Sequence, residues 1–283
     1  MKAYVRAVWS WWHGQPRKLM ALFTDYSGFF DDSGHETRDF LICGGLMLDV
    51  GDAHQQNAFE TEWHEAIKPL VYLHTTDYIA GDRDFKAFKN TGLGGKRELL
   101  VRAAKVIAKY SLQTFSAALV MEDYCRINNE TVFSEVVAYP FSLCARFASV
   151  QVSHWAKFHA MNERVKLIFE RRTGQGEIDA VFVRDKLDPP SFEGKDVCGL
   201  QAADLIAWTH QGKATNSLNY QRIGKDVKAE LVASLHTADT IRYQDMRRTL
   251  RLGTDGLDMA RAAMKNGVAF RQTPKNTRTR FKK

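Results

Sequence analysis

The feature that most constrains this chain is the run Phe29-Phe30-Asp31-Asp32-Ser33-Gly34, an apolar segment that ends in two adjacent carboxylates and a glycine. Apolar, β-forming residues precede this run, and Ser33-Gly34 is a turn signal, so we expect a strand over residues 21–32. Charged groups are costly to bury unless they are paired or bind a cation. Acids at the end of a core strand therefore indicate a metal or catalytic site. The alternative is that one of the two acids is a surface turn residue.

The composition is that of a folded protein without a disulfide framework. The 283 residues are 45% hydrophobic, which is enough for one large domain or two modest ones. The four cysteines are scattered, with no Cys-x-x-Cys pair, and no secretory signal is recognisable. We therefore expect a reducing, cytoplasmic environment rather than disulfides or a zinc cluster.

The first 19 residues contain three tryptophans among basic residues. Their uncharged core, residues 7–12, is too short to span a membrane. We expect a loosely ordered leader, or a natural start at Met20, and no membrane partner. Contact of the tryptophans with a membrane surface is the weaker alternative.

Positive charge is concentrated at the other end of the chain. The net charge is +7, and residues 271–283 contain no acid and most of the surplus, namely Arg271, Lys275, Arg278, Arg280, Lys282 and Lys283. Such a tail is typical of proteins that hold phosphate backbones with salt-sensitive affinity. A solvated terminus without a specific partner is an equal alternative.

Periodicity predicts both strands and helices along the chain. We expect strands at residues 40–48, 70–73, 115–121 and 165–170, the first of them forming an antiparallel hairpin with the opening strand. We expect helices at residues 53–68, 96–110, 131–158 with an interruption near Pro140, and 197–208, with further helices from 223 onward.

Two of these later elements repeat the acidic pattern of the opening strand. The strand at 165–170 ends in Glu170, followed by Arg171-Arg172 and a glycine-containing loop. The helix at 197–208 is strongly apolar but contains Asp204, which shares a face with Gln201 and Trp208. A structural aspartate, satisfied by a backbone amide or an arginine, is the alternative for Asp204.

Three carboxylates on rigid elements are the ligand type that Mg²⁺ or Mn²⁺ prefers. Competing catalytic patterns are poor, because the chain has no Gly-x-Ser-x-Gly elbow, no His-Glu-x-x-His, and no cysteine paired with an obvious base. The three acids, Asp31, Glu170 and Asp204, are therefore the candidate metal ligands.

Four segments resemble, in order and approximate spacing, the bacterial and phage domain-of-unknown-function 3800 family, which is grouped with ribonuclease H-like folds. The resemblance covers roughly residues 22–211, and its two end motifs are the most specific. The segments are Phe29-Phe30-Asp31-Asp32-Ser33-Gly34, Leu73-His74-Thr75-Thr76-Asp77, Leu167-Ile168-Phe169-Glu170, and Gly199-Leu200-Gln201-Ala202-Ala203-Asp204-Leu205-Ile206-Ala207.

The resemblance implies an α/β fold, namely a ribonuclease H-like mixed sheet flanked by helices, with helical additions and an acidic cluster at the carboxyl ends of the strands. Asp31, Glu170 and Asp204 match the family's acids, and Asp32 is either a further ligand or a turn residue. His74 matches a recurrent histidine, which we expect to orient a carboxylate or a substrate phosphate, and we expect Gln201 to support the acids from beside them. The corresponding organisation is a leader at 1–19, the domain at 20–215, a helical extension at 216–270 and the basic tail at 271–283.

The function expected from these residues is metal-dependent hydrolysis of RNA or DNA, with Asp31, Glu170 and Asp204 holding Mg²⁺ or Mn²⁺. Nucleic-acid phosphates would be bound by Arg171, Arg172, Arg278, Arg280, Lys282 and Lys283. One alternative is a non-catalytic module that binds nucleic acid or protein, as a mobile-element or phage-defence accessory. Another is a structural protein with accidental acids. The sequence leaves open the choice of RNA or DNA and the oligomeric state.

Overall fold

The structure is a computed structural model that describes residues 26–33, 39–131, 139–159, 165–171, 175–184, 188–231, 236–242 and 244–246. Its strands are β1 Tyr26–Ser33, β2 Phe40–Asp49, β3 Gln113–Val120, β4 Lys166–Glu170, β5 Ser191–Glu193 and β6 His236–Ile241. Its α-helices are α2 Ala53–Ile67, α3 Thr75–Ala80, α4 Leu93–Tyr110, α5 Met121–Glu130, α7 Pro140–Phe158, α8 Gln175–Arg184, α9 Cys198–Ala214 and α10 Lys225–Leu231. A 3₁₀ helix, η1 Arg83–Phe88, and a π-helix, η2 Tyr220–Gly224, complete the described elements.

The described strands form one mixed sheet in the order β5-β4-β1-β2-β3-β6. β1, β2 and β3 form an antiparallel meander, which confirms the predicted hairpin between the first two strands. β4 lies parallel to β1, with Phe30 opposite Phe169. Since parallel strands end at the same edge of a sheet, Asp31 and Glu170, which directly follow these two phenylalanines, lie at the same edge.

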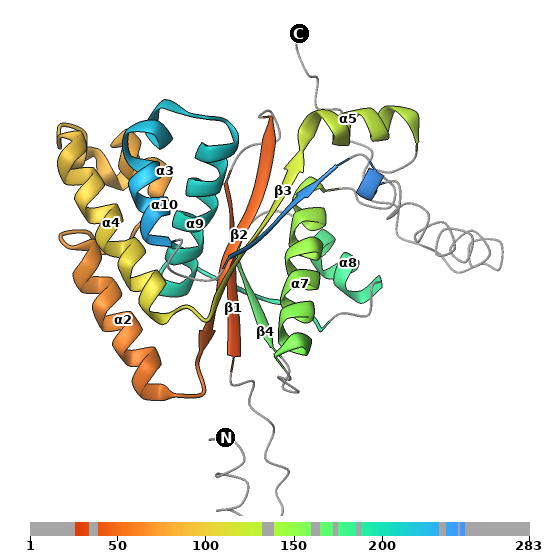
Figure 1. The fold of residues 1–283 in the computed structure, drawn as a ribbon, viewed down its shortest axis with the longest axis horizontal. Helices are drawn as coiled ribbons and strands as arrows, with labels where there is room; N and C mark the ends of the chain where they lie inside the picture. Colours follow the sequence, from red (N-terminus) through yellow and green to blue (C-terminus); the bar gives the residue numbers. More distant parts are fainter. Residues whose placement is uncertain are drawn as a thin grey trace, which may run out of the picture.

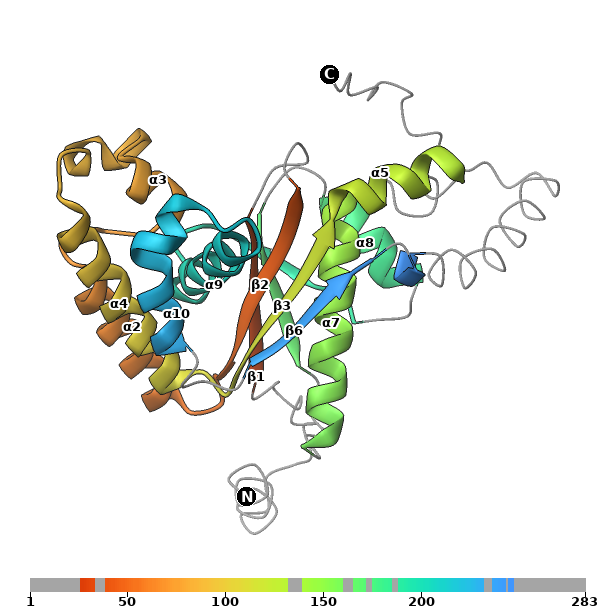
Figure 2. The same cartoon turned by 45° about the horizontal axis from the view of Figure 1, so that its top comes forward.

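Helices cover both faces of this sheet (Figure 1). Helices α2, α3, α4, α9 and α10 lie on one face, and α7 and α8 lie on the other, as the turned view also shows (Figure 2). Because both faces are covered, side chains on both faces of the central strands are buried, and every residue of β2 except its two ends is buried. The protein therefore has the expected α/β class with a mixed sheet.

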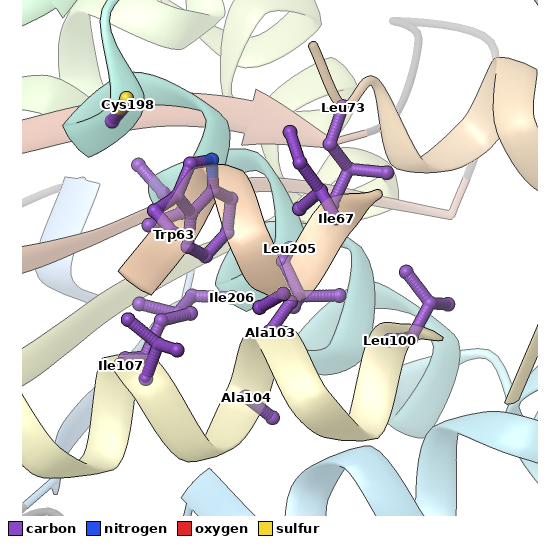
Figure 3. Close-up of a cluster of buried hydrophobic side chains, with 14 of the residues drawn as sticks. Trp63, Ile67, Leu73, Leu100, Ala103, Ala104, Ile107, Cys198, Leu205 and Ile206 are labelled. Carbon is purple, nitrogen blue, oxygen red and sulfur yellow. The ribbon is translucent and has the colours of Figure 1, made fainter. Parts of the chain in front are cut away.

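The core on the α9 face contains one large cluster of buried side chains, part of which Figure 3 shows. Trp63 and Ile67 from α2 meet Leu100 and Ile107 from α4, and Leu205 from α9 lies between these helices. Trp63 and Ile67 lie four residues apart on α2 and therefore on the same face of this helix.

Two glycines allow α9 to lie directly on the sheet. A Cβ at Gly199 would lie 2.5 Å from the ring of Phe29 on β1, and a Cβ at Gly44 on β2 would lie 2.7 Å from the backbone of Ala207. Both distances are shorter than non-bonded carbon atoms tolerate, so the close approach requires glycine at both positions. As a result, α9 holds its single acid, Asp204, over β1 and β2.

One of the predicted strands is absent from the structure. The strand expected at residues 70–73 is a loop, because the backbone N–H of Leu73 is satisfied by the side chain of Gln201 and not by a neighbouring strand. The helical stretch expected at residues 131–158 with an interruption near Pro140 is α7 from Pro140 onward, and Pro140 occupies the first helical turn, where its missing N–H costs nothing. Residues 132–138 lie outside the described residues.

The region expected to be a helical extension, residues 216–270, contains helix α10 but also strand β6, which pairs parallel with β3. Residues in β6 include the β-branched Thr237, Thr240 and Ile241, which favour a strand. The leader at 1–19 and the basic tail at 271–283 lie outside the described residues. No helix in the described part of the chain is long and apolar enough to cross a membrane.

Candidate active site

Five of the predicted site residues line one hollow beside the sheet edge where β1 and β4 end. The empty volume of the hollow is about 200 Å³ when the adjoining space open to solvent is included. Asp31 comes from β1, Glu170 from β4, His74 from the residue that precedes α3, and Gln201 and Asp204 from α9. Its lining is completed by Leu73, Lys195 and Leu200. Positions separated by up to 173 residues (31 to 204) thus meet at one place.

A second hollow of similar size, about 220 Å³, lies between β2, α2 and the end of α4. Its lining residues include one carboxylate, Asp49, and otherwise consist of apolar, amide and tyrosine side chains. Several titratable groups converge in the first hollow but not in this one, so the first is the candidate active site.

Asp204 is the most deeply buried acid of the hollow, with 4% of its surface exposed. Its Oδ2 atom accepts a hydrogen bond of 2.5 Å from the backbone N–H of Thr75. Burial raises the pKa of Asp204 above its ordinary value, although the nearby His74 ring and the Thr75 N–H oppose this rise. Glu170 raises the pKa of Asp204 further. The backbone amide that would satisfy a purely structural aspartate is present, because the Thr75 N–H donates to Asp204. Burial nevertheless disfavours the ionised form of Asp204, as is common for acids at functional sites.

Asp31 and Glu170 complete the acidic lining. Asp31 is 5% exposed, and the side chain of Glu170 is 12% exposed. Glu170 Oε1 lies 3.2 Å from Nζ of Lys195, which belongs to the loop between β5 and α9. The lysine therefore neutralises one of the three carboxylates.

The ring of His74 lies beside the carboxylate of Asp77, three residues later in the chain. Its Nδ1 atom lies 3.0 Å from Oδ2 of Asp77, without the alignment of a hydrogen bond, and Nη1 of Arg83 lies 3.3 Å from the same oxygen. A left-handed residue, Gly81, with φ of 68°, ends α3 and turns the chain back so that Arg83 reaches Asp77. Asp77 therefore lies against the imidazole at the edge of the hollow.

Gln201 connects both walls of the hollow. Its Oε1 atom accepts hydrogen bonds of 3.0 Å from the indole N–H of Trp63 and from the backbone N–H of Leu73. Its Nε2 atom donates a hydrogen bond of 3.0 Å to the backbone oxygen of Lys195. One buried side chain thus positions the segment that contains His74 and the loop that contains Lys195.

Two further residues of the site, Lys195 and Thr75, are not predicted by the sequence pattern. The signal for Lys195 is weak, since it consists only of a glycine-lysine-aspartate segment, residues 194–196, just before the apolar helix that contains Asp204. Thr75 lies inside the His74–Asp77 motif, but its contribution is a backbone N–H, which residue type does not reveal.

The remaining predicted site residues are not part of the lining or cannot be placed. Arg171 donates to the backbone oxygen of Phe192 on β5 at 3.3 Å, and its exposed side chain does not line the hollow. The backbone of Asp32 pairs with Cys43 on β2, but the side chain of Asp32 lies outside the described residues. Arg172, Arg278, Arg280, Lys282 and Lys283 also lie outside them, so their roles stay predictions.

The side-chain types in the hollow, which include three shielded carboxylates, are those that hard divalent cations prefer. In the described parts of the chain, however, no group of three or more histidine, cysteine or acidic side chains stands close enough together to hold a metal ion. Glu170 is paired with Lys195, and Asp204 with the Thr75 N–H. A cation bound here would compete with these two partners.

Comparison of the chain with models of known protein families, with curated proteins and with solved structures finds no match in any of the three. The chemistry of the hollow is therefore the basis on which we infer function.

Proposed function

We propose that this protein is a metal-dependent nuclease of ribonuclease H-like architecture, which hydrolyses phosphodiester bonds of RNA or DNA in the hollow between β1, β4 and α9. The observation that supports this most is that Asp31, Glu170 and Asp204, distant in sequence and on three rigid elements, line the same hollow. Chance placement of three acids offers no reason for this convergence.

The fold supports the proposal at a general level. It is a mixed sheet with helices on both faces, and Asp31 and Glu170 lie near the carboxyl ends of two parallel neighbouring strands. Ligand sites in sheets of this kind are commonly found at the carboxyl ends of the strands. The resemblance of the four sequence segments to a ribonuclease H-like family agrees with this architecture.

Each lining residue has a role that its position suggests. Asp31, Glu170 and Asp204 would hold Mg²⁺ or Mn²⁺, which when bound lowers the pKa of a water ligand and stabilises negative charge on the leaving oxygen. His74, held by Asp77, would orient a phosphate oxygen or the attacking water. Gln201 keeps the two walls at a constant separation, which is the positional control that this chemistry requires.

The test is cleavage of labelled single-stranded RNA and DNA with and without Mn²⁺. We expect Asp204→Asn to abolish Mn²⁺-dependent cleavage while the protein stays folded, because the amide is a poor ligand but retains an oxygen that can accept the Thr75 N–H. The matched control is Asp226→Asn, an exposed acid on α10 that is paired with Arg97 and does not line the hollow. Cleavage retained in Asp204→Asn would remove this residue from the site.

Metal binding is measured separately by thermal unfolding. A real site raises the melting temperature as Mn²⁺ is added, and Asp31→Asn should remove this rise. Stabilisation by Mn²⁺ together with nucleic-acid binding but no cleavage would favour the non-catalytic binding module instead.

A further inference from the structure

We propose that the 3₁₀ helix η1 carries a phosphate-binding surface, formed by the exposed side chains of Arg83, Lys86 and Lys89, which binds the backbone of a single nucleic-acid strand beside the hollow. These three residues are called the basic ridge below. The proposal rests on the proposed function for the class of its partner, but binding at the basic ridge requires no metal ion.

The basic ridge stands on packed aromatic side chains. Phe85 of η1 is 3% exposed, and the centroid of its ring lies 5.2 Å from that of Tyr72 and 5.9 Å from that of Tyr78. Phe88 meets Tyr78 edge-on, also with 5.9 Å between centroids. One side of η1 is thus fixed to the core, which leaves its charged residues on the exposed side.

The two lysines of the basic ridge lie on the same side of η1. They are three residues apart, and Lys89 keeps a right-handed helical backbone, with φ of −55° and ψ of −41°. Residues three apart in a 3₁₀ helix lie one above the other, about 6 Å apart along the axis. A Cβ at Gly81 would lie 2.5 Å from Cα of Lys89, so the chain closes on itself and Lys89 lies beside the end of α3.

Little negative charge offsets the basic ridge. Lys86 and Lys89 form no ion pair with any of the residues that the structure describes. Residues 82–89 contain three cations and two acids, and one of these acids, Asp84, accepts a hydrogen bond of 2.5 Å from the hydroxyl of Tyr72. Neighbouring cations without acidic partners repel each other, and an anionic ligand relieves this repulsion.

Arg83 connects the basic ridge to the hollow. Its Nη1 atom lies 3.3 Å from Oδ2 of Asp77, and Nδ1 of His74, which lines the hollow, lies 3.0 Å from the same oxygen. Arg83 has φ of 50°, a left-handed conformation that residues other than glycine adopt at an energetic cost. With the arginine side chain 71% exposed, its ion pair with Asp77 contributes little to stability, so stability does not explain an arginine at this position.

A nucleic-acid strand is the partner that fits this surface best. Each nucleotide contributes one phosphate charge, so a row of cations can neutralise successive phosphates of one strand. An acidic peptide offers similar charge. The strand is favoured because the basic ridge begins beside the hollow in which we propose that a phosphodiester is hydrolysed.

The experiment uses the full chain and measures binding of a fluorescent single-stranded oligothymidine over a range of NaCl concentrations. EDTA is present throughout, so neither metal binding nor metal-dependent cleavage contributes. The variants are the double substitution Lys86→Gln/Lys89→Gln and the single substitution Arg83→Gln. The matched control is Lys157→Gln/Lys166→Gln, which removes two exposed lysines at the end of α7 and at the start of β4, the opposite end of that strand from Glu170. Melting temperatures verify that each variant is folded.

We expect Lys86→Gln/Lys89→Gln to reduce the slope of log Kobs against log salt by about 1.4, since each phosphate contact on a single strand contributes about 0.7. A fourfold increase in salt should then weaken binding about sevenfold less than in the wild type. Arg83→Gln should reduce the slope by about 0.7, and the control should leave it unchanged.

A slope in Lys86→Gln/Lys89→Gln equal to that of the control would overturn the proposal, and Mn²⁺-dependent cleavage by the wild type would then still support the nuclease function. A slope that depends on the basic ridge in a protein that never cleaves would support the surface and refute the nuclease function. Displacement of the oligothymidine by polyglutamate as effectively as by unlabelled oligothymidine of equal charge would identify an acidic protein as the partner and overturn the proposal. Absence of oligothymidine binding at any salt concentration would also overturn it.

Discussion

Gln201 is the residue whose loss should affect the hollow most strongly without removing an acid. Gln201→Met keeps the length of the side chain but leaves the indole N–H of Trp63 and the backbone N–H of Leu73 without their acceptor. Trp63 is fully buried and Leu73 is 2% exposed, so water cannot replace the lost partner at either donor. At about 1–3 kcal/mol for each unsatisfied buried group, the free energy of unfolding should fall by about 2–6 kcal/mol.

The assay is urea unfolding followed by circular dichroism, with melting temperatures measured in parallel. For a domain of this size the loss corresponds to a fall of roughly 4–24 °C in melting temperature. The matched control, Gln56→Met, changes an exposed glutamine on α2 whose hydrogen bond to Glu60 is solvated, and it should cost less than about 0.5 kcal/mol.

A double-mutant cycle isolates the hydrogen bond from the effects of packing. Trp63→Phe removes the indole donor, so Gln201→Met should cost about 1–3 kcal/mol less in that background than in the wild type. A coupling energy near zero, or a cost of Gln201→Met no larger than that of Gln56→Met, would refute the inference that Gln201 holds the walls of the hollow together.

Two further predictions concern the elements that position Asp204. In the absence of divalent ions, Asp204→Asn should be more stable than the wild type at pH 8, and this gain should shrink as the pH falls towards 4. The reason is that burial raises the pKa of Asp204 above its ordinary value of 3.8, so the stability that its proton provides is complete below pH 3.8 and is lost as the pH rises through the folded-state pKa. Melting temperatures at pH 5 and pH 8 measure the gain, and a gain independent of pH would contradict the burial of an ionisable acid. Gly44→Ala should lower the free energy of unfolding by about 1–3 kcal/mol, because its Cβ would meet the backbone of Ala207, whereas Gly94→Ala on α4, where a Cβ has open space, should raise it by about 0.5–1 kcal/mol. Urea unfolding of both variants tests this contrast, and an equal effect at the two glycines would show that α9 does not need the close approach at β2.

The local sequence pattern correctly predicted the helices and strands whose hydrophobic periodicity and end signals are clear. The helix expected at residues 53–68 is α2, and the strands expected at 40–48 and 165–170 are β2 and β4 to within one residue at each end. These segments combine clear periodicity with sharp end signals, such as Pro69 after α2. The same local logic failed at residues 70–73, because whether an apolar tetrapeptide pairs as a strand depends on which distant donor or acceptor reaches its backbone. Here that partner is the side chain of Gln201, 128 residues away from Leu73.

That two core strands end in acids, and that one apolar helix contains an aspartate, can be predicted from the amino-acid sequence alone, because hydrophobic periodicity and the polar residues that interrupt it are local properties. That these acids share a hollow is a property of the tertiary structure. That outcome depends on the parallel register of β1 and β4, on the contact of α9 with the sheet that Gly44 and Gly199 permit, and on the loop that places Lys195 beside Glu170. Each of these joins residues far apart in the chain, and contacts between distant residues leave no period in the sequence from which they can be predicted.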